Sequence, residues 1–113
     1  MNDARCSVRF TRRYPAAPSE VWAALTEPES LRRWLGEAEW AALGARAREL
    51  EPERLLVLDW RAPGEEASLV RFELTADGDG TMLVLDHSLI EEQLGMAYTH
   101  RWTVSLDRLG RLR

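Results

Sequence analysis

Four segments of the chain have the apolar patterns of β-strands. They are residues 5–14, 54–60, 68–75 and 81–90. Residues 54–60 are apolar on both faces, which indicates a central strand of a sheet. The other three alternate between apolar and polar side chains, as half-buried strands do. In the last segment the alternation predicts one shared face for Leu83, Leu85, His87 and Leu89.

Turn-forming residues separate these strands. Residues 76–80, with the sequence ADGDG, tolerate positive φ and predict a hairpin between the last two strands. Pro63 and Gly64 mark a turn after residue 60. The strands from residue 54 onward are therefore expected to form an antiparallel meander.

Three further segments have helical features. Pro18 and Pro28 each suit the first position of a short helix. Neither helix is long enough to be stable alone, so both must pack on the rest of the protein. The longest helical pattern covers residues 91–113, and its apolar stripe consists of Leu94, Tyr98, Trp102, Leu106, Leu109 and Leu112. Such a stripe must be buried, and only the sheet is large enough to cover it.

Length and composition predict one α+β domain over residues 1–113. The net charge of −4 and the pI of about 5.2 argue against a nucleic-acid-binding protein. No apolar run approaches the ~20 residues that span a membrane. The N-terminus has no apolar segment typical of a secretion signal. The expected location is therefore the cytoplasm.

The basic residues are all arginines, which excludes Schiff-base catalysis by lysine. Several of them, including Arg5 and Arg9, fall on the polar face of the first strand. A solvated face is the simpler interpretation of this stripe, and recognition of a ligand or partner is the alternative.

Motifs for metals, cofactors and nucleophilic catalysis are missing from the sequence. Two histidines and the single Cys6 do not offer the three or four ligands that a metal site needs. There is no phosphate-binding loop, no dinucleotide-binding motif and no nucleophile elbow. We therefore expect no catalytic residue, no metal and no cofactor.

The aromatic residues are the main candidates for a site, since five tryptophans in 113 residues is a high number. Trp22 and Trp34 are interpreted as core residues. The elements that would face a cavity carry Trp60, Phe72, Tyr98 and Trp102, which either fill the core or line a ligand site. His87 lies on the apolar face of its strand. It is either a core histidine with satisfied hydrogen bonds or a polar contact to a ligand, and a general base is the third alternative.

The order of these segments resembles the SRPBCC superfamily and, within it, homologues of the heat-shock-protein ATPase activator. The resemblance rests on YPAAPSEVWAALTEPESLRRWL, ELEPERLLVLDW, VRFELTADGDGTMLVLDHSLI and GMAYTHRWTVSLDRL, which appear in the family's order. It implies a helix-grip fold, in which a curved antiparallel sheet wraps a long C-terminal helix and two short helices close one end. In many members of the superfamily, the gap between sheet and helix is a ligand cavity.

The chain departs from the family's pattern between the second short helix and residue 47, where about two strands are missing. Residues 37–47 alone favour a helix, because alanine and leucine are strong helix formers. The resemblance instead implies a strand in ARAREL, residues 45–50, with residues 37–43 as a helical or irregular bridge. Trp40 and Leu43 are the candidates for closing the gap, either over a cavity or against a second subunit.

Three functions follow from the resemblance. The first is non-enzymatic binding of a small hydrophobic molecule or lipid, with Trp60, Phe72, His87, Tyr98 and Trp102 as ligand-binding residues. The second is a protein-interaction or chaperone-associated module that acts as a homodimer. The third is an enzyme of the polyketide cyclase or aromatase type, with His87 and Tyr98 as acid and base.

Overall fold

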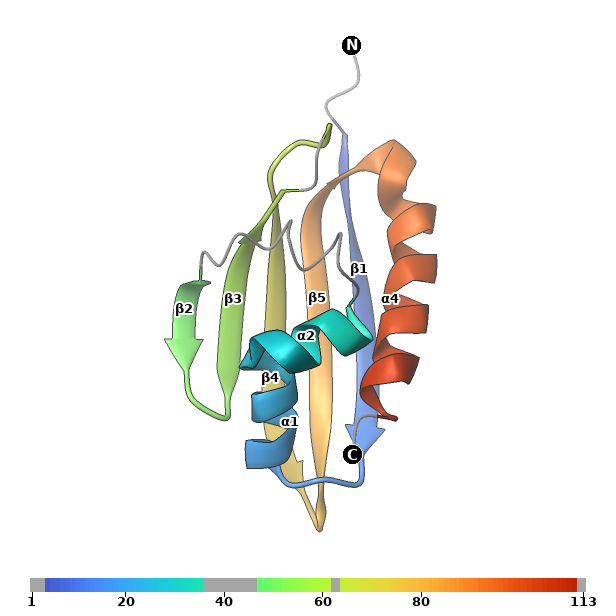
Figure 1. Ribbon diagram of the computed structural model, residues 1–113. Helices are drawn as coiled ribbons and strands as arrows, with labels where there is room; N and C mark the ends of the chain where they lie inside the picture. The colour runs from blue at the N-terminus through green and yellow to red at the C-terminus, as the bar shows by residue number, and fades with distance from the viewer. Residues whose placement is uncertain (1–3, 36–46, 62–63, 112–113) are drawn as a thin grey trace.

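One antiparallel sheet holds all the strands of the computed structural model, which describes residues 4–35, 47–61 and 64–111 (Figure 1). The strand order is β1-β5-β4-β3-β2. The strands are β1 (Arg5–Tyr14), β2 (Ala47–Glu51), β3 (Leu55–Trp60), β4 (Ser68–Asp77) and β5 (Gly80–Glu91). All four predicted strands are confirmed, and β3 lies inside the sheet as its two apolar faces indicated.

The two short helices begin where the prolines placed them, α1 at Pro18–Thr26 and α2 at Pro28–Trp34. Glu27 separates them with an extended backbone (φ −79°, ψ 129°). The proline that follows it disfavours the helical conformation, so α1 cannot continue into α2. Both helices lie across one face of the sheet (Figure 1).

The long C-terminal helix is shorter than the predicted residues 91–113. Strand β5 continues through Glu91, which pairs with Arg5 of β1. A 3₁₀ turn, η1 (Glu92–Leu94), follows, and α4 spans Gly95–Leu109. Because Glu91 is paired in the sheet, helical structure begins only at the residue after it. The last residue of the predicted stripe, Leu112, lies outside the described residues.

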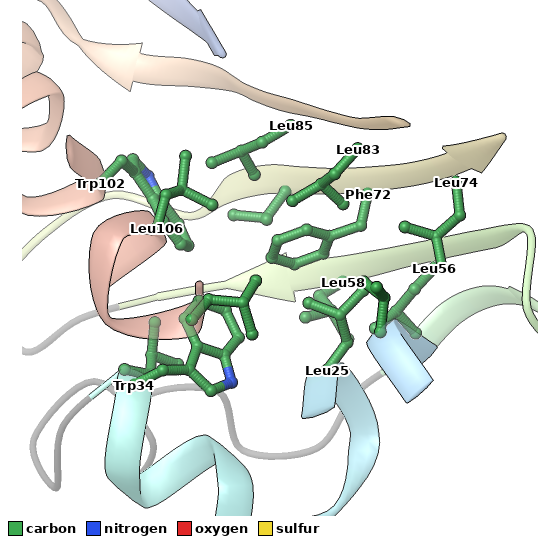
Figure 2. Close-up of a cluster of buried hydrophobic side chains, with 14 of the residues drawn as sticks. Leu25, Trp34, Leu56, Leu58, Phe72, Leu74, Leu83, Leu85, Trp102 and Leu106 are labelled. Carbon is green, nitrogen blue, oxygen red and sulfur yellow. The ribbon is translucent and has the colours of Figure 1, made fainter. Parts of the chain in front are cut away.

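The core lies between this face of the sheet and the helices. Figure 2 shows Phe72, Leu83 and Leu85 of the sheet pointing toward Trp102 and Leu106 of α4. Trp34 of α2 and Leu25 of α1 close the same cluster. Thus the α+β class and the sheet wrapped around the long helix are as expected. No helix among the described residues is long and apolar enough to cross a membrane.

A β-bulge in β5 makes the prediction for Leu89 wrong. Val8 of β1 pairs with His87, but Cys6 pairs with Ile90, so β5 has one residue more than β1 at this point. Leu89 has a φ of 62° and is 54% exposed, whereas Ile90 is 1% exposed. A prediction from strict alternation of side chains does not allow for this extra residue. In the structure Ile90 therefore takes the inward position that was expected for Leu89.

The stretch before β3 is only partly described. Strand β2 begins at Ala47, which confirms the strand for the second half of ARAREL. The predicted turn follows it, and the Arg54 backbone N–H donates to the Glu51 carbonyl at 3.0 Å. Residues 37–46, including Trp40 and Leu43, lie outside the described residues.

The arginines of β1 form ion pairs with acids on three other parts of the fold. The pairs are Arg9 with Asp86 (3.4 Å), Arg12 with Asp107 (2.9 Å), and Arg13 with Asp77 (2.9 Å) and Asp79 (3.0 Å). Exposed ion pairs are individually weak, but these pairs link the edge strand to β5, α4 and the hairpin. Of the predicted stripe, Arg9 is among these residues, and recognition of a ligand or partner by the stripe stays an untested alternative.

The bulge gives a test by substitution. Leu89→Asn should raise the free energy of unfolding by about 0.5–1 kcal/mol, because asparagine tolerates the left-handed conformation that costs leucine about 1–2 kcal/mol. Urea denaturation measures the change. Leu69→Asn, at a half-buried position of regular β4, should lower stability instead. An equal loss in both variants would show that Leu89 is an ordinary strand residue.

Candidate functional site

The five predicted site residues converge at one place in the core. Trp60, Phe72 and His87 come from β3, β4 and β5, and Tyr98 and Trp102 lie one turn apart on α4. None is more than 3% exposed. Ring centroids lie 4.5 Å apart for His87 and Tyr98, 5.5 Å for Trp60 and Trp102, and 6.0 Å for Phe72 and Trp102. We call these five residues the aromatic cluster.

His87 is hydrogen-bonded through both ring nitrogens. The indole Nε1–H of Trp102 donates to His87 Nδ1 at 3.0 Å, so Nδ1 carries no proton. The proton is therefore on Nε2, which lies 2.8 Å from Ser68 Oγ and donates to it. The Ser68 hydroxyl in turn donates to the Trp60 carbonyl at 3.3 Å. This chain of donors and acceptors requires a neutral imidazole.

Burial favours the same neutral form. It lowers the pKa of His87 from 6.5 to about 4, and the charge of Arg101 lowers the pKa further in the same direction. A proton on Nδ1 would also set the imidazolium N–H against the Trp102 N–H. Both effects keep His87 uncharged at neutral pH.

The contact between Ser68 and His87 is not arranged as a nucleophile and its base. In such a pair, the imidazole Nε2 accepts the serine proton, and a third group holds the proton on Nδ1. Here Nδ1 accepts from Trp102, and the Nε2 proton points at the serine oxygen. The imidazole therefore has no lone pair with which to activate Ser68.

Tyr98 connects the aromatic cluster to the loop between β3 and β4. Its hydroxyl accepts the Trp60 indole N–H at 3.0 Å and donates to Glu65. Burial, followed by this bond to Glu65, raises the pKa of Tyr98 to about 12, so the phenol stays protonated. The Arg101 guanidinium lies 4.7 Å from the Tyr98 ring centroid and 4.0 Å from the Glu65 carboxylate. Glu65 was not a predicted site residue, because it lies in a loop without periodicity.

The aromatic cluster leaves almost no free space. The space beside Trp60, Tyr98 and Trp102 has a volume of about 10 Å³. That is at the lower limit for a single water molecule. No buried side-chain nitrogen or oxygen of the described residues lacks a hydrogen-bond partner. In this conformation the five side chains fill the core themselves, and ligand binding by them stays a prediction.

A larger pocket lies at the opposite end of α4. It has a volume of about 420 Å³. It is lined by Tyr14 and Ala16 at the end of β1, by Glu20, Val21, Ala23 and Ala24 of α1, and by Leu109 and Gly110. Figure 1 shows α1 and the last turn of α4 at the same end of the sheet. We call this space the α1–α4 pocket.

Small side chains account for the α1–α4 pocket. Ala16, Ala23 and Ala24 fill little of the space beside the end of α4, whereas Gly110 packs closely against the Tyr14 ring. Tyr14 supports one wall, since its hydroxyl donates to the Leu106 carbonyl at 2.9 Å. This pocket was not predicted from the sequence, where its only signal was the three alanines beside and within the first short helix.

A metal site is not formed by the part of the chain that the structure describes. Residues 4–35, 47–61 and 64–111 contain no group of three or more histidine, cysteine, aspartate or glutamate side chains that could hold a metal ion.

The curved antiparallel sheet, the long C-terminal helix and the two short helices after β1 place the protein in the helix-grip class of α+β proteins. The family model described as "Activator of Hsp90 ATPase homolog 1-like protein" matches residues 15–112. The chain therefore belongs to this family, as the resemblance in the sequence indicated.

Solved structures agree with this assignment. CalU16 from Micromonospora echinospora is 31% identical over 93% of this chain and 74% of its own, with a TM-score of 0.77. An AHSA1-like protein from Rhizobium etli is 30% identical over 95% and 81% of the two chains, with a TM-score of 0.75. The Aha1 dimer from Colwellia psychrerythraea has a TM-score of 0.76 over 93% of each chain, but at 18% identity it shows the fold alone. Comparison with curated protein sequences gave no match.

The environment of His87 predicts how stability depends on pH. Its pKa is about 4 in the folded protein and near 6.5 when unfolded, so the unfolded chain takes up the proton first as pH falls. The contribution of His87 to the free energy of unfolding is therefore highest above about pH 6.5, where the imidazole is neutral in both states, and it falls as the pH drops toward 4. Between pH 7.5 and 5.5 the free energy of unfolding should fall by about 1 kcal/mol from this group.

Urea denaturation at several pH values measures this dependence. His87→Gln removes the titrating group, so its stability should change less than that of the wild type over the same interval. Parallel curves for the two proteins would contradict a buried, neutral His87.

Proposed function

We propose that the protein binds a small apolar molecule in the α1–α4 pocket and catalyses no reaction. The observation that carries this proposal is the size and lining of that pocket. Its volume of about 420 Å³ falls in the range of about 300–1,000 Å³ that is typical of ligand sites. Apolar side chains form most of the wall, and Glu20 is the one charged residue among the described residues that line it.

The aromatic cluster is a less favourable place for the ligand in this conformation. Beside it there is room for about 10 Å³ only. A ligand would have to rotate Trp102 or Tyr98, which breaks the bonds to His87 or Glu65 and leaves buried polar atoms without partners. Binding by the five predicted residues thus remains a proposal that requires the core to open.

An enzyme of the polyketide cyclase or aromatase type is less well supported. Such an activity would use His87 and Tyr98 as acid and base. The bonds of His87 to Ser68 and Trp102, and of Tyr98 to Trp60 and Glu65, favour structural roles for both side chains.

Filling the α1–α4 pocket tests the proposed function. Ala23 lines the pocket on α1, and Ala23→Trp places a large ring in it. We expect at least a tenfold loss of affinity for the neutral fluorescent probe N-phenyl-1-naphthylamine, because the ring occupies the space of the ligand. The probe's fluorescence measures binding, and a thermal melt confirms that the variant is folded.

The matched control is Ala97→Trp, which adds the same side chain at an exposed position of α4 outside the pocket. It should bind the probe like the wild type. Unchanged binding in Ala23→Trp, together with lost binding in Trp102→Phe, would place the ligand at the aromatic cluster instead.

A second function, as a homodimeric interaction module, is favoured by Leu50. It is 54% exposed on β2, which is the outermost described strand on its side of the sheet. Its partner on the adjacent strand β3 is the buried Leu56, so the apolar face of the sheet extends to this edge. Exposed apolar edges are common places for contact with another chain. A protein of the same fold, Aha1 from Colwellia psychrerythraea, forms a dimer.

Sedimentation equilibrium tests the dimer. The wild-type chain should form dimers at micromolar concentrations, and Leu50→Glu should shift them to monomers because it places a charge in the contact. Leu89 is also 54% exposed, so Leu89→Glu is the matched control and should leave the dimer intact. A wild-type protein that remains monomeric at the highest concentrations would refute the dimer.

A further inference from the structure

The α1–α4 pocket has almost no hydrogen-bond donors to offer a ligand. Among the described residues that line it, Tyr14 is the only one whose side chain carries a donor. The Tyr14 hydroxyl already donates to the Leu106 carbonyl at 2.9 Å. An anionic or acceptor-rich head group would therefore lose its hydration on entering the pocket without gaining a donor in return.

Several acceptors in the wall of the pocket are also occupied. The alanine carbonyls of the wall accept bonds from other parts of the fold: Ala16 from the Thr81 hydroxyl (2.7 Å), Ala23 from the Glu27 N–H (2.9 Å) and Ala24 from the Trp34 indole (2.8 Å). The groups that remain are the Glu20 carboxylate and the carbonyls of Leu109 and Gly110. The latter belong to the end of α4, where helix carbonyls have no partner inside the helix.

These remaining groups are all negative or partly negative. Glu20 is exposed in the first turn of α1 and forms no ion pair with any described residue. The end of α4 adds the negative pole of its helix dipole. Arg108 in the same turn and the positive N-terminal end of α1, where Glu20 lies, partly offset this charge, but neither Arg108 nor any other basic residue is among the described residues that line the pocket. The rim of an otherwise apolar pocket thus combines a carboxylate with acceptors and lacks a cation of its own among the described residues that line it.

We propose that the α1–α4 pocket selects an amphiphile with an apolar body and a protonated amine head. The apolar body packs against Val21, Ala24 and Leu109. The ammonium group lies at the rim, where its N–H donors meet the Glu20 carboxylate and the last carbonyls of α4. This inference rests on the proposed function and adds the chemical class of the ligand to it.

Three ligands of equal chain length test the selection. Decylamine, decanol and decanoate are titrated below their micellar concentrations against the protein loaded with N-phenyl-1-naphthylamine, and their binding is also measured by calorimetry. We expect affinity to fall in the order amine, alcohol, carboxylate. Added salt should weaken binding of the amine and leave that of the alcohol nearly unchanged.

Glu20→Gln removes the charge at the rim and keeps the size of the side chain. It should weaken decylamine binding by about two- to fivefold, as expected for an exposed ion pair, without affecting decanol. Glu29→Gln is the matched control, because Glu29 occupies the first turn of α2 and does not line the pocket. It should bind all three ligands like the wild type.

The results separate the charge preference from the proposed function. Equal affinities for amine and alcohol, or no effect of Glu20→Gln, would overturn the preference for amines while the binding of neutral ligands stands. If the probe and all three ligands fail to bind, both proposals are wrong.

Discussion

The polar atoms of the buried aromatic side chains must find partners inside a dry core, and this requirement connects the elements of the fold. Each buried tryptophan or tyrosine bonds to an element other than its own. The bonds run from Trp34 to Ala24, from Trp60 to Tyr98, from Trp102 to His87, from Tyr14 to Leu106 and from Tyr98 to Glu65. Because an unsatisfied buried donor costs about 1–3 kcal/mol, each bond restricts the relative position of two elements. Helix α4 takes part in four of the five.

The same requirement determines where the protein has space. At the aromatic cluster, large rings with satisfied polar atoms meet from three strands and α4, and only about 10 Å³ remains. At the other end of α4, alanines replace the rings, and about 420 Å³ remains. A ligand therefore fits best where the sequence has small side chains, although the aromatic residues are the more conspicuous feature of the sequence.

Much of the fold could be predicted from the sequence because it depends on local patterns. Alternation placed Phe72 and His87 on the apolar faces of their strands, and helical periodicity placed Tyr98 and Trp102 on one side of α4. That these faces meet was implied by the resemblance to the helix-grip fold, and the structure brings them together. The predicted inward orientation of Leu89 was wrong, because a bulge adds a residue to β5 without changing the apolar pattern of the sequence.

The parts of the site that escaped prediction depend on contacts between distant segments. Glu65 lies in a loop, and only the position of Tyr98 shows that it is a partner. The α1–α4 pocket exists because the last turn of α4 and the helix α1 lie a certain distance apart, which no local pattern encodes. From the sequence, alanines in a helix indicate only a strong tendency to form that helix. That they also leave empty space becomes visible only when the positions of the neighbouring elements are known.

The bonds along α4 also bear on how the pocket would receive a ligand. The Trp102 indole holds one turn of the helix to β5, and the Leu106 carbonyl, one turn further, accepts the Tyr14 hydroxyl from β1. Leu109, which lines the pocket, follows within the next turn. A wall fixed by these two bonds would already be ordered before a ligand arrives, so the proposed binding would avoid the entropic cost of ordering it.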